Sequence, residues 1–117
     1  MRGALAAVAF GVLPAMALAK CLPATERPLP RPTSQQFMAV LITCDDRLDA
    51  MKTYADLSSK YPEALAATAL NVDEVNAGAK GVYFRALLGK PGSKKDASGT
   101  CTALKAVGYN WCRTMQY

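Results

Sequence analysis

The 117-residue chain contains no histidine, and this absence excludes several kinds of site at once. Catalytic arrangements that pair serine or cysteine with an imidazole cannot form, and neither can a zinc site with histidine ligands. Four cysteines are too few for a knottin-like scaffold but enough for two disulfide bonds. The sequence has no Cys-x-x-Cys pair and no glycine-rich phosphate loop, so we expect no metal and no cofactor.

The acidic residues do not form a recognisable catalytic pair. Glycosidases place two carboxylates about 5–9 Å apart across a cleft. Here the carboxylates fall mostly on expected helix surfaces, and Asp45, Asp46 and Asp49 are typical of a helix cap followed by a solvated face. We therefore expect a non-enzymatic protein.

Residues 1–19 have the features of a secretory signal peptide. Arg2 supplies a positive charge, and the apolar run after it is short for a bilayer span. Ala17-Leu18-Ala19 matches a small-x-small cleavage pattern, which predicts a mature chain beginning at Lys20. An uncleaved anchor or a buried helix is the alternative. We expect export to the periplasm, an oxidising compartment, with no transmembrane segment after cleavage.

Residues 20–35 form a proline-rich leader. Its prolines are Pro23, Pro28, Pro30 and Pro32. Such a chain favours extended polyproline II, and we do not expect it to form a ladder or a helix. It is either a spacer or partner ligand, or a leftover connection between the signal peptide and the domain.

Residues 36–117 form one domain in which strand and helix patterns alternate. Apolar and β-branched runs predict strands over residues 36–43, 65–72, 81–88 and 110–116. Helical spacing predicts a helix over residues 47–60, which Pro62 stops. A second helix begins after Ser93, which forms a capping box with Asp96, and ends before Gly108. The order is βαββαβ.

An offset of 47 residues aligns the two halves of this domain. The matched pairs include Phe37 with Phe84, Leu41 with Leu88, Asp49 with Asp96, Thr53 with Thr100 and Leu57 with Leu104. The repeat predicts two βαβ-like halves that share one sheet. This is the α+β, ferredoxin-like or RNP-like plan, an antiparallel sheet with two helices on one face and the other face open.

Residues 83–113, YFRALLGKPGSKKDASGTCTALKAVGYNWCR, resemble the second half of a SPOR domain, the sporulation-related repeat of bacterial envelope proteins. Shared features are the aromatic-Arg-apolar strand, the Gly-Pro turn, the serine before the helix, the Leu-Lys-Ala-x-Gly helix end and the two cysteines. The resemblance covers roughly residues 36–117. It departs at Val40 and Ile42, where the family usually has glutamine and glycine.

The SPOR resemblance implies a periplasmic, cell-envelope module that binds peptidoglycan glycan strands lacking their stem peptides, typically at sites of cell division. Because neighbouring residues of a strand point to opposite faces of the sheet, the residues of such a site would share one face. If Phe84, Ala86 and Leu88 face the helices, the opposite face carries the glycan-binding candidates, which are Val40, Tyr83, Arg85, Leu87, Trp111 and Arg113. Aromatic rings stack on sugars, and arginine offers donors in a rigid fork.

Each candidate also has a structural interpretation. Tyr83 and Trp111 can cap the edge of the core, and Arg113 can be a solvated charge. The apolar stripe of Met38, Val40 and Ile42 is either a floor for a sugar or a protein, or is buried under the leader or the C-terminus.

The cysteine spacing predicts one disulfide bond and permits a second. Cys101 and Cys112 lie 11 residues apart across a helix-to-strand return, which suits a bond between the second helix and the last strand. Cys21 and Cys44 either pair, folding the leader back across the domain, or leave Cys44 buried and Cys21 free.

Two other functions remain open from the sequence. One is a periplasmic adaptor that docks an envelope or division protein through the open sheet face, and the other is a domain of a secretion or conjugation apparatus. Nucleic-acid binding fits the RNP-like plan and the basic pI of about 9.2. We discount it because the chain is expected to be exported and lacks the aromatic RNP pattern.

Overall fold

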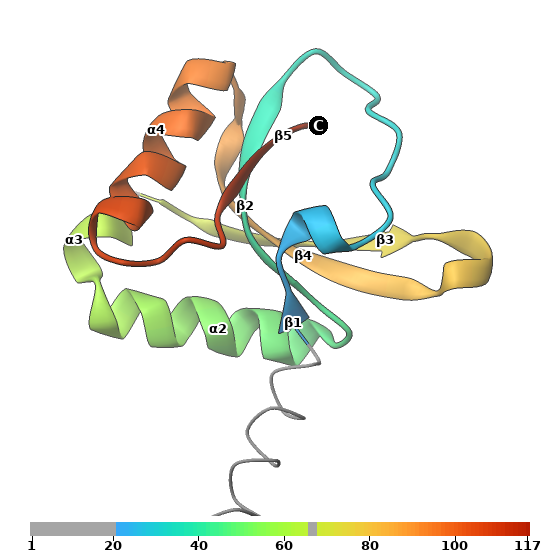
Figure 1. Ribbon diagram of the computed structural model, residues 1–117, viewed down its shortest axis with the longest axis horizontal. Coiled ribbons are helices and arrows are strands. Elements are labelled where there is room, and N and C mark those ends of the chain that lie inside the picture. The colour runs from blue at the N-terminus through green and yellow to red at the C-terminus, as the bar shows by residue number, and fades with distance from the viewer. Residues whose placement is uncertain (1–20, 66–67) are drawn as a thin grey trace, which may run out of the picture.

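The computed structural model describes residues 21–65 and 68–117, so the predicted signal peptide, residues 1–19, lies outside the described residues. Five antiparallel strands form one sheet, with helices packed against it (Figure 1). The strands are β1 (Cys21–Leu22), β2 (Phe37–Cys44), β3 (Leu70–Asn76), β4 (Val82–Gly92) and β5 (Arg113–Gln116). The helices are α2 (Arg47–Lys60), α3 (Pro62–Leu65) and α4 (Lys94–Ala106), with 3₁₀ turns η1 (Ala24–Glu26) and η2 (Gly78–Lys80). The α+β class is confirmed.

The sheet is organised around β2. Its ladder with β4 runs the length of the strand, and β4 in turn pairs with β3. The other edge of β2 is shared, because β5 pairs with residues 37–40 and β1 with residues 43–44. The path β1-β2-β4-β3 differs from the ferredoxin order because the leader contributes a strand. The expectation that the leader forms no ladder and no helix is therefore wrong at β1 and η1.

Local capping sets the helix boundaries close to those expected. The Asp46 carboxylate accepts a hydrogen bond from the Leu48 amide at 2.9 Å and begins α2. The Ser93 hydroxyl accepts from the Asp96 amide at 3.0 Å and begins α4. Pro62 does not simply end a helix, because it opens the short α3, where its missing amide proton costs nothing. As a result β3 begins at Leu70, later than the predicted strand.

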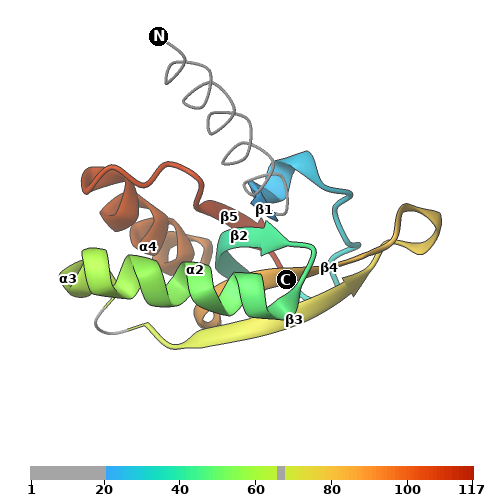
Figure 2. The same ribbon diagram turned by 90° about the horizontal axis from the view of Figure 1, so that it is seen from below.

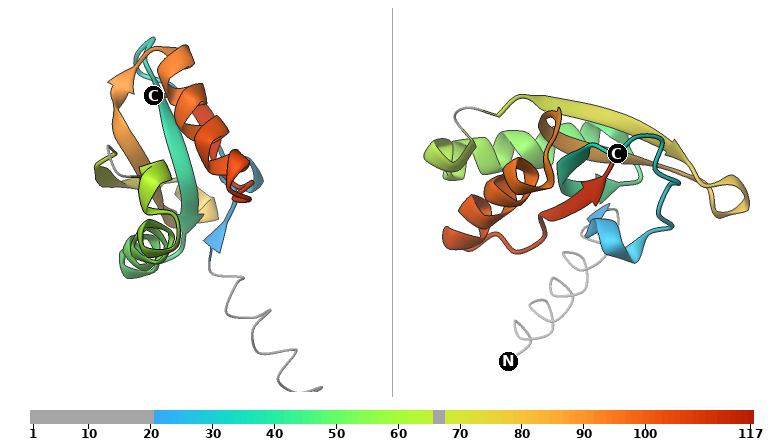
Figure 3. Two further views of the ribbon diagram at one scale, coloured as in Figure 1. Left: turned by 90° about the vertical axis from the view of Figure 1, so that its left-hand side faces the viewer. Right: turned by 90° about the horizontal axis from the view of Figure 1, so that it is seen from above.

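One face of the sheet packs against α2 and α4 (Figures 2 and 3). Its centre consists of Ala39 and Leu41 from β2, Ala86 and Leu88 from β4, and Leu104 from α4, all buried. This is the face that strand alternation predicted for the helices. The hydrophobic effect thus fixes the position of both helices.

The opposite face is not open, which corrects the sequence prediction. Residues 23–35, called the strap below, run from β1 to β2 and cross this face (Figure 1). Ala24 packs there in a second buried cluster with Met38, Val40 and Leu87. An uncovered stripe of such side chains would expose apolar surface to water, so its burial stabilises the strap on the sheet.

A bulge in β2 moves Ile42 away from this strap face. Val40 is opposite Leu87 and Ile42 is opposite Ala86, so the register shifts between them. Cross-strand partners point to the same side of a sheet, and Ile42 therefore joins the helix-side core. The predicted stripe of Met38, Val40 and Ile42 is correct for the first two residues and wrong for the third.

Both cysteine pairs are bonded. The Cys101–Cys112 bond joins α4 to the segment before β5. The Cys21–Cys44 bond joins β1 to the end of β2, so the leader does fold back across the domain. Two disulfide bonds indicate an extracytoplasmic compartment. Within residues 21–65 and 68–117, no helix has the length and apolar character needed to cross a membrane.

Candidate functional site

The predicted binding residues of β2 and β4 lie on the expected face but beneath the strap. Val40 and Leu87 are fully buried, and Tyr83 is only 3% exposed. Their alternation is correct, because the intervening Ala86 faces the helices. These three side chains form packing surface here and present no platform on which a glycan can lie.

Tyr83 holds the middle of the strap. Its hydroxyl donates a short hydrogen bond to the carbonyl of Pro28. The guanidinium of Arg27 lies over the ring, 5.4 Å from its centroid. Burial raises the pKa of the Tyr83 hydroxyl, and the nearby charges of Arg85 and Arg27 partly oppose this rise. The aromatic ring predicted to stack on a sugar instead stacks under the strap's own arginine.

Arg85 is a buried charge on the strap face, only 7% exposed. One terminal nitrogen forms an ion pair with Asp73, the cross-strand partner of Arg85 on β3. The guanidinium also lies 5.9 Å from the centroid of the Tyr117 ring. Its Nε is buried and has no hydrogen-bond acceptor among the described residues. A buried donor without an acceptor is rare, and here it borders a pocket.

The structure does not bring Trp111 and Arg113 to Tyr83 and Arg85. Trp111 precedes β5 and is 36% exposed. Arg113 donates to the carbonyls of Asn110 and Cys112, at 2.6 and 2.9 Å. Since β5 pairs only with the first half of β2, these residues lie beside Val40, away from the end of the strand where Arg85 faces Thr43. The six candidates do not form one surface.

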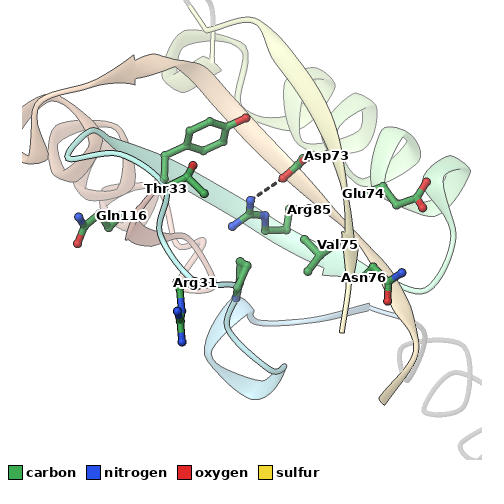
Figure 4. A pocket seen from close by; sticks show the side chains of 10 residues that line it. Arg31, Thr33, Asp73, Glu74, Val75, Asn76, Arg85 and Gln116 are labelled. Carbon is green, nitrogen blue, oxygen red and sulfur yellow. Dashed lines mark hydrogen bonds and ion pairs between the residues drawn. The ribbon is translucent and has the colours of Figure 1, made fainter. Parts of the chain in front are cut away.

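A polar pocket remains between the strap and the sheet, and we call it the strap pocket (Figure 4). Its volume is about 270 Å³. Three structural regions contribute its lining: the strap, the β3–β4 pair and the C-terminal residues. The lining residues are Pro30, Arg31, Thr33, Asp73, Glu74, Val75, Asn76, Arg85, Gln116 and Tyr117.

The side-chain charges of the strap pocket balance. Arg31 and Arg85 supply two positive charges, and Asp73 and Glu74 supply two negative ones. Figure 4 shows the Arg85 guanidinium between Asp73 and the strap residue Thr33. The remaining polar side chains are the amides of Asn76 and Gln116 and the hydroxyls of Thr33 and Tyr117, which can all donate and accept. This lining suits an uncharged ligand with many hydroxyl groups better than a strongly charged one.

Sequence reasoning found only Arg85 of these ten residues. Asp73 carried a usable signal, because a carboxylate in the strand paired with β4 is a natural partner for an arginine in that strand's interior. Tyr117 and the strap residues carried no such signal, since their position follows from the tertiary fold. Among the residues that the structure describes, no three side chains of the metal-ligating types gather into a metal site.

Comparison of the chain with protein-family models, with curated proteins and with solved structures finds no match.

Proposed function

We propose that this chain is an exported module of the bacterial cell envelope that binds the glycan strands of peptidoglycan, and that the strap pocket is its sugar site. The motif resemblance of residues 83–113 to SPOR domains supports the first part. The arrangement of the strands agrees with it, because without the added β1 the order β5-β2-β4-β3 is that of a split βαβ fold. The two disulfide bonds fit a periplasmic location.

The observation that carries the proposal is the polar pocket around Arg85, whose lining side chains carry two positive and two negative charges. Sugar hydroxyls and acetamides need fixed donors and acceptors, which Asp73, Arg85 and the amide of Gln116 provide. The Tyr117 ring lines the same pocket and offers a face for the C–H side of a sugar. Pockets for drug-sized ligands are roughly 300–1,000 Å³. The strap pocket is slightly smaller, which suits a single sugar ring of a longer strand.

The adaptor alternative loses its docking surface in this structure. It relied on an open sheet face with Val40 at its centre, and Val40 is 1% exposed. A Val40→Asp variant would place a carboxylate in the buried cluster under Ala24 and would test folding instead of docking.

Co-sedimentation with purified sacculi tests the proposed function. Stem peptides are removed from half of the sacculi with an amidase, and the oxidised protein is added to both preparations. We expect clear enrichment on the stripped glycan. Equal binding to both preparations, or none, would contradict the proposal.

Two variants then locate the site. Tyr117→Leu removes the aromatic face while keeping an apolar side chain, and we expect its affinity for stripped sacculi to fall about fivefold to tenfold. Trp111→Ala is the control, because Trp111 does not line the strap pocket, and its binding should match the native protein. Loss of binding in Trp111→Ala alone would move the site to the β5 end of the sheet.

A further inference from the structure

Part of the strap pocket belongs to the strap itself. Pro30, Arg31 and Thr33 of the strap line it, and Figure 4 shows Arg31 and Thr33 on the side away from Glu74 and Asn76 of β3. Arg31 is exposed and makes no hydrogen bond or ion pair with any residue that the structure describes. Its five donor groups and the Thr33 hydroxyl are therefore available to a ligand. A segment that only covered the sheet would not need to present polar groups to a pocket.

The strap is held in place at its far end, next to the pocket. The amide and the hydroxyl of Ser34 both donate to the carbonyl of Tyr117, at 2.9 and 2.8 Å. The Thr33 amide donates to the same carbonyl at 3.2 Å, and the Gln116 side-chain amide donates to the Ser34 carbonyl at 2.8 Å. These bonds fix the C-terminal strand and the strap relative to each other.

The near end and the middle of the strap are held from outside the pocket. The Cys21–Cys44 bond precedes the strap, and the Thr43 hydroxyl donates to the carbonyl of Leu22 at 2.8 Å. Arg27 continues this anchoring with a hydrogen bond to Thr43 and an ion pair with Asp45, at 3.0 and 2.7 Å. No residue of this group lines the strap pocket.

We infer that the strap is a constituent side of the binding site and not a lid over it, and that the Cys21–Cys44 bond maintains the affinity of the strap pocket for glycan. Arg31 and Thr33 are the ligand-contacting residues of the strap. This inference rests on the proposed function. Its physical basis is preorganisation, because a proline-rich segment held firmly at both ends loses little further freedom when a sugar binds. A segment that has lost its covalent tie at one end fluctuates more, and the ligand must order it further.

The two disulfide bonds provide a matched experiment. Cys21→Ala/Cys44→Ala removes the covalent tie at the near end of the strap and leaves only its non-covalent contacts, whereas Cys101→Ala/Cys112→Ala removes a bond from α4 and leaves the covalent tie of the strap intact. Both proteins are titrated with stripped sacculi below their unfolding temperatures. We expect the first to bind about tenfold more weakly than the native protein, which corresponds to about 1.4 kcal/mol, and the second to bind within about twofold of it.

A milder variant keeps the test valid if the first protein does not fold. Tyr83→Phe retains the ring and removes only the hydrogen bond to Pro28, so it loosens the middle of the strap without touching the pocket. We expect its affinity to fall about twofold to threefold. Thr33→Val should reduce affinity by a similar factor by removing a contact group, without changing the stability of the fold.

The outcomes separate the inference from the proposed function. If the native protein fails to bind stripped sacculi, both are wrong. If the native protein binds and the strap-released proteins bind as well or more tightly, the strap is a passive cover or a lid, and the inference is overturned while the proposed function stands. Equal losses in both disulfide variants would also overturn it, because the effect would then follow general destabilisation.

Discussion

The two faces of the sheet are buried by different means. On the helix face, α2 and α4 pack regular apolar side chains such as Leu104 against Leu41 and Leu88. On the strap face, a segment without regular periodicity contributes the small Ala24, and polar bonds from Arg27 and Tyr83 hold the rest. A sheet face can therefore be closed by a tied segment as well as by packed helices, and the tied segment brings polar groups of its own to a pocket on that face.

The largest expected effect comes from truncating the centre of each face. Leu104→Ala and Leu87→Ala both remove a fully buried side chain. We expect losses in the free energy of unfolding of about 3–4 kcal/mol for the first and about 2–3 kcal/mol for the second, because the strap can settle into the cavity more easily than a helix can. Denaturant unfolding measures both. A loss below about 1 kcal/mol for Leu87→Ala would mean that the strap face is not a true core.

The next effect concerns the buried charge on the strap face. Asp73→Asn leaves the Arg85 guanidinium without its counter-charge. Because Asp73 is itself partly exposed, we expect a loss of about 2 kcal/mol, below the full penalty for a deeply buried pair. Asp56→Asn on the exposed side of α2 is the control, with an expected change within about 0.5 kcal/mol. If Asp73→Asn and Asp56→Asn had equal effects in chemical denaturation, the Arg85 guanidinium would be stabilised by water and not by Asp73.

A smaller effect on stability distinguishes two tyrosine hydrogen bonds, one on each face of the sheet. Tyr109 donates to the buried Leu41 carbonyl at 2.6 Å, and Tyr83 donates to the carbonyl of the exposed Pro28. Water can replace the partner in the second case more easily than in the first. We therefore expect Tyr109→Phe to cost about 1.5 kcal/mol and Tyr83→Phe about 0.5–1 kcal/mol in thermal unfolding. The reverse order would mean that the strap bond is the better shielded one.

The smallest predicted effect is a pH-dependent loss of stability. It is absent at neutral pH and develops only in alkaline solution. Burial raises the pKa of the Tyr109 hydroxyl strongly and that of Tyr83 less, whereas both titrate near pH 10 when unfolded. The folded protein then binds more protons than the unfolded one, so stability is complete below about pH 10 and falls as the pH rises above it. Melting temperatures across this range should show a shallower decline in Tyr109→Phe. An unchanged slope would assign the decline to other groups.

The helix face could be predicted from the sequence because its determinants are local. Period-two alternation in Phe84, Ala86 and Leu88 and capping at Ser93 fixed which side each residue faces and where α4 begins. The bulge that turns Ile42 inward was not predictable, since nothing in the run of residues 36–43 marks a register shift.

The strap face could be predicted only in part, for a physical reason. Alternation correctly placed Tyr83 and Arg85 together, but whether that face is open depends on a segment whose prolines rule out regular pairing over most of its length. Two sequence features pointed to the fold-back: the possible Cys21–Cys44 pair, and the apolar stripe containing Met38 and Val40, for which burial under the leader was one alternative. The strap pocket arises from contacts among three distant segments, and no local pattern encodes such a meeting.

The bond between Ser34 and Tyr117 spans 83 positions of the chain and closes the strap pocket. Contacts between such distant residues are slow to form, because a large loop must close before any of them is made. The sheet and its helices can therefore assemble first, and the strap pocket is complete only when the last strand reaches the beginning of the domain. Refolding followed by fluorescence should accordingly show ligand-binding capacity returning after the bulk of the secondary structure.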